Sequence, residues 1–348
     1  MIKKSEEEVD FSVGKIVKSI DRSNANRYLY SNTWQALNFK TESDQLSRIH
    51  DLDKNNNKLL PLRKEVSNNT NPTKPTPRIT CSRAYDFTIF GGYSDGKLFK
   101  IYLESNNPTR LDNDYNDSHI GEVTSIVWNG KKNMLYTSGL DGKIKIFEDK
   151  SKEEEYSPGQ DAITCLELNQ EDCQLYAASY QVFYIFDISL VESNPIVSIP
   201  ERHKQSYIVS LSFIRSKKLI ITGDTLGKIC FWKIGEDDDY NIEIQLFKEL
   251  VRPNQYIIQT IYLENRNMIL INSRKSKNNE NKTEYLEFDD ECNIKSLKNN
   301  FLNWDGIDSN YICNYINFDE KEKELIFCFA ECNKGEGGKI VFYELSNN

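Results

Sequence analysis

Short runs of alternating apolar and polar residues, separated by polar turns, recur along this chain. The clearest set lies between His119 and Glu148 and reads HIGEVTSIVWNGKKNMLYTSGLDGKIKIFE. Its three apolar runs are 123–128, 134–138 and 143–147. A period of two predicts strands, and Asp141-Gly142 supplies a tight turn between the last two. A three-stranded sheet cannot bury both faces alone, so we expect it to be one unit of a larger stack.

The same order of apolar runs and turns recurs in six other segments. Their first runs begin near Ile16, Ile79, Ile163, Ile208, Ile257 and Ile312. Their third runs, with that of the clearest set, are WQALNF, KLFKIYL, KIKIFE, FYIFDI, KICFWKI, YLEFDD and KIVFYEL. A spacing of roughly 40–50 residues is typical of four-stranded propeller blades. The pattern therefore predicts an all-β fold with seven blades, filling residues 1–348 as a single domain.

These residues resemble the WD-repeat family of β-propellers. His119 takes the place of the family's histidine, Asp141 that of its turn aspartate, and Phe147-Glu148 replace the terminal Trp-Asp pair. The resemblance covers nearly the whole chain but is uneven.

Two further units match the family in part. The unit at His203 keeps Thr222 and Trp232, but Leu226 stands where the aspartate belongs. The unit ending at Phe186-Asp187 keeps only the aromatic-acid pair, and the rest match by spacing alone.

The resemblance implies a structural cluster of hydrogen bonds inside each well-matched blade. We assign it to His119, Thr137, Asp141, His203, Thr222 and Trp232. His119, Asp141 and a hydroxyl of Thr137 or Ser138 also fit the composition of a catalytic triad. No neighbouring sequence supplies a pocket or an oxyanion site, so we interpret the group as structural.

The composition indicates a reduced protein that needs no metal or cofactor. Its eight cysteines are scattered without a CxxC pair, and only three histidines are present. Neither set gives a zinc-ligand spacing, and we expect mostly buried thiols in a reducing compartment. The net charge of −9 disfavours direct nucleic-acid binding.

The start of the chain has no apolar run long enough for a signal peptide, and no segment approaches a membrane helix. We therefore expect a cytoplasmic protein that is not secreted. A nuclear or ciliary location is the alternative.

Ring closure is expected to join the two ends of the chain. Few residues follow KIVFYEL, whereas Lys3 to Phe11 precede the first predicted strand. We predict that this N-terminal segment pairs beside Lys339 to Leu345 as the outer strand of the last blade.

Long insertions at about 42–78 and 273–284 are expected on the face of the turns between second and third strands. Their basic residues are candidates for partner binding: Lys74, Arg78, Arg274, Lys275 and Lys277. Acidic runs at 148–156, 236–239 and 319–324 are expected on the opposite face. Within the first insertion, KLLPLRKEV can form the outer strand of the first blade.

The favoured function is a non-catalytic scaffold for protein interactions, within a larger intracellular assembly and without a small-molecule substrate. Most members of the family are scaffolds, so this expectation comes from the resemblance. A phosphoinositide-binding propeller is an alternative, although the Phe-Arg-Arg-Gly motif of such proteins is missing. A propeller hydrolase is a further alternative, although the chain has no GxSxG motif.

Overall fold

The structure of this protein is a computed structural model that describes most of the predicted strands. The described residues are 2–9, 17–19, 28–32, 46–53, 58–67, 79–85, 88–102, 111–112, 115, 119–149, 151–190, 194–199, 202–236, 242–263, 267–276, 281–289, 294–299, 312–318, 323–330 and 338–345. Their strands pair into seven antiparallel sheets of four strands each. The chain divides into two compact units: residues 1–118 with 310–348, and residues 119–309.

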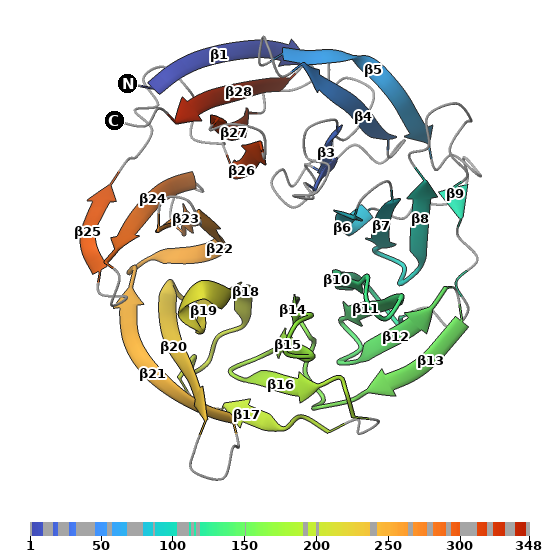
Figure 1. The fold of residues 1–348 in the computed structure, drawn as a ribbon, viewed down its shortest axis with the longest axis vertical. Coiled ribbons are helices and arrows are strands. Elements are labelled where there is room, and N and C mark those ends of the chain that lie inside the picture. The colour runs from blue at the N-terminus through green and yellow to red at the C-terminus, as the bar shows by residue number, and fades with distance from the viewer. Residues whose placement is uncertain are drawn as a thin grey trace. The chain divides into compact units, whose positions relative to one another are not determined.

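The second unit, 119–309, contains four of the sheets, each formed by consecutive strands (Figure 1). The first two sheets consist of β10 (Val123–Asn129), β11 (Met134–Gly139), β12 (Ile144–Glu148) and β13 (Ser151–Tyr156), and of β14 (Cys165–Asn169), β15 (Gln174–Ala178), β16 (Phe183–Asp187) and β17 (Val197–Ile199). The next two consist of β18 (Ile208–Ile214), β19 (Leu219–Asp224), β20 (Lys228–Glu236) and β21 (Ile242–Val251), with a short 3-10 turn η2 (Arg215–Lys217), and of β22 (Gln255–Leu263), β23 (Met268–Lys275), β24 (Asn281–Phe288) and β25 (Ile294–Asn299).

The first unit contains the other three sheets. Two are formed by β2 (Val17–Ser19), β3 (Tyr28–Asn32), β4 (Leu46–Asp53) and β5 (Lys58–Ser67), and by β6 (Ile79–Tyr85), β7 (Thr88–Tyr93), β8 (Leu98–Tyr102) and β9 (Leu111–Asp112). The third joins β1 (Ile2–Val9) to β26 (Ile312–Phe318), β27 (Lys323–Ala330) and β28 (Gly338–Leu345).

The N-terminal strand lies antiparallel beside the last strand of the chain. Ile2 pairs with Leu345 and Val9 with Gly338, so all eight residues of β1 have partners on β28. The predicted pairing of these two segments is therefore present within the first unit. The number of blades in one closed ring stays a prediction.

The core of the second unit lies between successive sheets. One cluster joins β10–β13 to β14–β17, where the rings of Tyr156 and Phe186 stack at 5.0 Å. A second joins β14–β17 to β18–β21, where Phe183 meets Trp232 at 5.2 Å. A third joins β18–β21 to β22–β25. Because apolar residues of β14–β17 and of β18–β21 alternate between two such clusters, these two sheets are buried on both faces.

Hydroxyl side chains on the first strands also connect neighbouring sheets. Thr124 Oγ1 donates to the Ile163 carbonyl, and Thr164 Oγ1 donates to the Ile208 carbonyl. Between the sheets β18–β21 and β22–β25, the Thr260 N–H donates to Ser210 Oγ at 2.9 Å. The four sheets of this unit are thus joined by hydrogen bonds as well as by apolar packing.

Three expectations about local structure were wrong. The third strand of the first sheet is β4, not WQALNF, whose residues 34–39 lie outside the described residues. The segment 42–78 is not mainly a loop, because β4 and β5 occupy much of it, and β5 is the outer strand predicted for KLLPLRKEV. The segment 273–284 is largely a hairpin, in which Ser273 pairs with Lys282.

Candidate functional site

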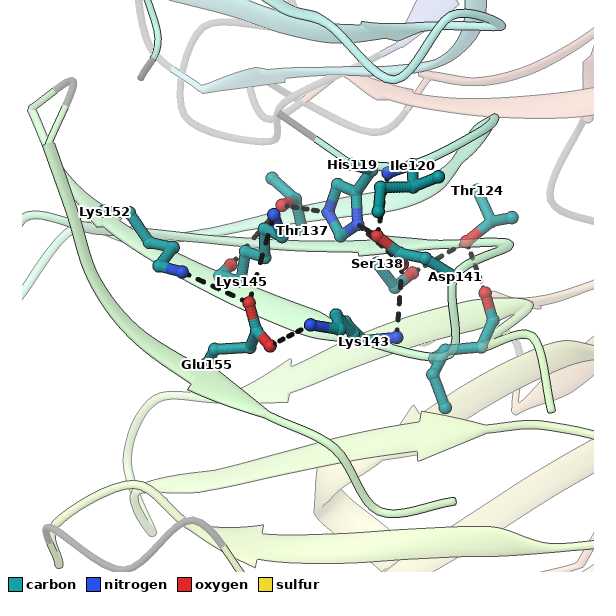
Figure 2. Close-up of polar contacts among 11 residues, drawn as sticks. His119, Ile120, Thr124, Thr137, Ser138, Asp141, Lys143, Lys145, Lys152 and Glu155 are labelled. Atoms are coloured by element: carbon teal, nitrogen blue, oxygen red, sulfur yellow. Dashed lines mark hydrogen bonds and ion pairs between the residues drawn. The ribbon is translucent and has the colours of Figure 1, made fainter. Parts of the chain in front are cut away.

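The sequence-predicted cluster at His119 is a buried hydrogen-bonded group in the sheet β10–β13 (Figure 2). His119 is 3% exposed, with Nδ1 2.9 Å from Asp141 Oδ1 and Nε2 2.8 Å from Thr137 Oγ1. Thr137, rather than Ser138, supplies the hydroxyl, since Ser138 Oγ bonds Thr124 instead at 2.9 Å. Both ring nitrogens are therefore held by neighbouring side chains.

Asp141 also fixes the turn between β11 and β12. Its carboxylate accepts hydrogen bonds from the backbone N–H of Ile120 at 3.0 Å and of Lys143 at 3.2 Å. Burial alone would raise the pKa of Asp141, but the hydrogen bond and charge of His119 and these two N–H donors outweigh it. The pKa therefore lies below its ordinary value of 3.8.

A second cluster, at His203, uses a carboxylate that the family's residue pattern did not indicate. His203 Nδ1 is 2.7 Å from Asp224 Oδ2, and its Nε2 is 2.7 Å from Thr222 Oγ1. The Trp232 indole N–H donates to the same hydroxyl at 2.9 Å. Leu226, expected in the acidic position, is 57% exposed and takes no part in the cluster.

The pKa of Asp224 is also below its ordinary value. Burial again acts to raise it, and the hydrogen bond from His203 is the largest opposing effect. Further donors are the Lys228 N–H at 2.8 Å and the Ser206 hydroxyl at 2.8 Å. With the Leu226 N–H at 2.9 Å, four groups thus stabilise the anion, as a carboxylate that is only 1% exposed requires.

The sheet β22–β25 replaces the histidine cluster with a buried ion pair. Arg252 precedes Ile257 by as many residues as His203 precedes Ile208. Its Nε atom is 2.8 Å from Glu284 Oε2, and Glu284 is 1% exposed. Glu284 lies on the third strand, where it pairs with Ile271 of the second strand. Lys145 has the same position opposite Thr137 in the sheet β10–β13.

These clusters can hold turns in place, but their geometry gives them no access to a substrate. Thr137 and Thr222 are fully buried, and each hydroxyl is bonded to its histidine. The clusters instead fix a surface that we call the turn face. It comprises, in the second unit, the turns between second and third strands and the loops that precede first strands.

The backbone of the turn face is tied together within and between sheets. Within sheets, the Leu140 N–H donates to the Glu122 carbonyl at 3.0 Å, and the Thr225 N–H to the Tyr207 carbonyl at 3.0 Å. Between sheets, the Gln181 N–H donates to the Ser206 carbonyl at 2.9 Å. The face is therefore a braced surface rather than a set of independent loops.

Large apolar side chains are exposed on this braced face. They are Ile120 at 80%, Leu140 at 53%, Tyr207 at 39%, Leu226 at 57% and Val251 at 52%. Isolated exposed apolar residues are ordinary, but several on one face indicate a contact surface.

Of the basic candidates, the structure places Arg274 and Lys275 at the end of β23, beside the turn into β24. Lys275 is exposed and Arg274 is half-buried. Lys74, Arg78 and Lys277 lie outside the described residues.

The face opposite the turn face carries charges of both signs. Lys131 and Arg215 both approach the carboxylate of Glu171, at 3.0 and 3.6 Å. The run 148–156, expected there as an acidic loop, mostly forms the outer strand β13. The described part of the second unit therefore has no uniformly acidic face, because basic residues occupy the turns between first and second strands.

Comparisons with known proteins agree with this repeat architecture. A family model described as "WD domain, G-beta repeat" matches residues 115–148. No curated protein sequence matches the chain. No helix among the described residues is long and apolar enough to cross a membrane.

Solved structures share the fold at low sequence identity. A chain from the crystal structure of a mitotic checkpoint complex has a TM-score of 0.60 and 10% identity, over 100% of this chain and 91% of that one. Raptor from Chaetomium thermophilum has a TM-score of 0.63 and 14% identity, over 96% of this chain but 28% of that chain. At such identities the likeness concerns the fold alone. The chain therefore has a β-propeller fold, and its residues 115–148 match the WD-repeat model.

Proposed function

We propose that this protein is a non-catalytic scaffold that binds other proteins through its turn face, as a subunit of a larger intracellular assembly. The exposure of large apolar side chains on a braced surface carries the proposal, since such side chains gain most from being covered by a partner. The checkpoint-complex chain, which shares the fold, is itself part of an assembly.

The proposal includes a single seven-bladed ring that spans 1–348 and is closed by β1. It is supported by the seven four-stranded sheets and by the pairing of β1 with β28. A closed ring removes free sheet edges and provides a rigid platform.

The absence of catalysis and the cytoplasmic location belong to the same proposal. The hydroxyls that could serve as nucleophiles in the two histidine clusters are buried, and each is already bonded. Arg274 and Lys275 would contribute charge at the border of the binding surface. Lys74, Arg78 and Lys277, which lie outside the described residues, stay candidates from the sequence alone.

Affinity purification of the endogenous protein, followed by mass spectrometry and size-exclusion chromatography, tests the proposal. We expect a reproducible set of proteins that co-elute with it above its own mass of 40.5 kDa. Recovery of the protein alone, at its monomer mass, would contradict the scaffold function.

A further inference from the structure

Apolar side chains lie on both sides of the boundary between the sheets β14–β17 and β18–β21 on the turn face. The rings of Tyr180 and Tyr207 are 4.8 Å apart, and the two residues form an isolated β-bridge. Tyr207 exchanges hydrogen bonds with Thr225, accepting from its N–H at 3.0 Å and donating to its hydroxyl at 3.2 Å. Leu226, the next residue in the chain, is 57% exposed on the same turn face.

Val251 extends this group of side chains toward the sheet β22–β25. It pairs with Lys228, two residues after Leu226, and is 52% exposed. The next residue, Arg252, donates its N–H to the Gly227 carbonyl at 2.7 Å. We call Tyr180, Tyr207, Leu226 and Val251 the Tyr207 patch.

The backbone beneath the Tyr207 patch is already fixed without a partner. Gly227 has φ +84, and a Cβ there would lie 2.2 Å from the Arg252 carbonyl oxygen. Asp224 accepts from the N–H groups of Leu226 and Lys228, so the buried His203 cluster fixes the turn that exposes Leu226. A preformed apolar surface loses little conformational entropy when it is covered.

The loop that precedes Tyr207 carries two exposed basic residues. Arg202 and Lys204 are exposed, and neither has an ion-pair partner among the residues that the structure describes. Lys228 pairs with Glu249 at 3.3 Å and donates to the Arg202 carbonyl at 2.8 Å, so its charge is largely compensated. Arg202 and Lys204 are therefore exposed cations close to an apolar surface, on a chain whose net charge is −9.

We propose that the Tyr207 patch binds an acidic segment of a partner protein, which places a large apolar side chain against Tyr207 and Leu226. The inference rests on the scaffold function and specifies its partner by chemistry. Carboxylates of the segment pair with Arg202 and Lys204. The apolar contact supplies most of the affinity, and the charges supply orientation and rate of association.

Fluorescence anisotropy of the full chain with a labelled peptide of about ten residues, alternating Glu with Leu and Phe, tests this proposal. Two control peptides replace Leu and Phe with Ser, or Glu with Lys. We expect saturable binding of the first peptide alone, weakened by salt because the pairs are exposed. Absence of saturable binding, or equal binding of the Ser peptide, would overturn the proposal.

Two patch variants separate the apolar and charged contributions. Tyr207→Ser with Leu226→Ser is expected to weaken the peptide by at least about tenfold. Arg202→Glu with Lys204→Glu is expected to weaken it and to remove most of its salt dependence. The matched control, Leu190→Ser with Lys218→Glu, changes exposed residues at the opposite ends of the strands and should leave affinity within about twofold.

Thermal melting of each variant shows whether the fold is kept, and the apolar variants can be repeated singly if the double variant is unstable. Partners recovered by affinity purification and retained by both patch variants would refute this inference but leave the scaffold function standing. A patch-dependent dimer in light scattering would identify a second copy as the occupant and overturn the assignment to a partner protein.

Discussion

Asp224 holds Nδ1 of His203 from the end of the second strand, not from the turn that follows it. In the neighbouring cluster, Asp141 reaches the equivalent nitrogen of His119 from the turn itself. Two sheets of one chain therefore place a carboxylate against a buried histidine from different backbone positions. Substitutions at these positions are accordingly expected to affect stability differently.

Asp224→Ala should destabilise the protein by about 1–3 kcal/mol, because His203, Ser206 and two backbone N–H groups lose their acceptor. Leu226→Ala is the matched control and should change the unfolding free energy by less than about 0.5 kcal/mol, since Leu226 is exposed. Urea unfolding monitored by tryptophan fluorescence measures both. Equal stability of the two variants would refute the assignment of Asp224.

Gly139→Ala should destabilise the sheet β10–β13. Gly139 is the last residue of its strand, the position that Asp224 occupies in the sheet β18–β21. A Cβ at Gly139 would lie 2.6 Å from His119 Nδ1 and 2.9 Å from Asp141 Oδ1. Gly130→Ala is the control, because the nearest atom to its added Cβ is 3.6 Å away. We expect a lower melting temperature for the first variant only, and a tolerated Gly139→Ala would show that the cluster is looser than described.

Acidification should destabilise the protein through both aspartates. Their folded-state pKa values lie below the ordinary 3.8, so the unfolded chain binds protons first as the pH falls. The stabilisation is fully present above pH about 4 and is lost as the pH falls through the folded values. Asp141→Asn with Asp224→Asn should give a shallower decline of unfolding free energy between pH 5 and about 3. An unchanged slope would contradict this prediction.

Breaking the buried Arg252–Glu284 pair should cost more than replacing it. Glu284→Ala leaves the guanidinium, 12% exposed, without its carboxylate, and we expect a loss of about 3–5 kcal/mol. Arg252→Met combined with Glu284→Leu removes both charges and should be less destabilised than Glu284→Ala alone. Chemical denaturation of the two variants compares them directly, and the opposite order would refute the account of this pair.

Removal of residues 1–9 should destabilise the first unit, because β28 loses its antiparallel partner along all eight residues of β1. We expect a lower melting temperature and faster proteolysis between β26 and β28. Glu6→Lys with Glu7→Lys keeps the backbone pairing and should stay near the parent protein. A truncated protein that melts and elutes like the full chain would show that this pairing contributes nothing.

The sequence predicts strands and turns well where residue types repeat at fixed spacing. Thr137, Asp141 and Thr222 were assigned correctly to their clusters because hydroxyls and turn acids keep the family's positions. Asp224 was missed because Leu226, directly before Gly227, has the position that Asp141 has before Gly142. The loop from His203 to Ile208 is one residue longer than the loop from His119 to Val123. This difference in length was the signal that the two histidines are held by carboxylates from different positions.

The Arg252–Glu284 pair was hidden for another reason. The family pattern has a histidine at this position, whereas this sheet has Arg252 at the same spacing before Ile257. Exposure of Leu226 and Tyr207 could not be predicted either, since an apolar residue beside a turn is buried or exposed according to the neighbouring sheet. Periodicity within one sheet carries no information about that neighbour.

The hydroxyl bonds from Thr124, Thr164 and Ser210 have a mechanical consequence for the second unit. A chain of stacked repeats normally yields at its weakest junction, one repeat at a time. Here each junction between neighbouring sheets also includes a hydrogen bond near the first strands. A force that separates two sheets must therefore break polar and apolar contacts together. We therefore expect neighbouring sheets of this unit to resist separation better than sheets joined by apolar packing alone.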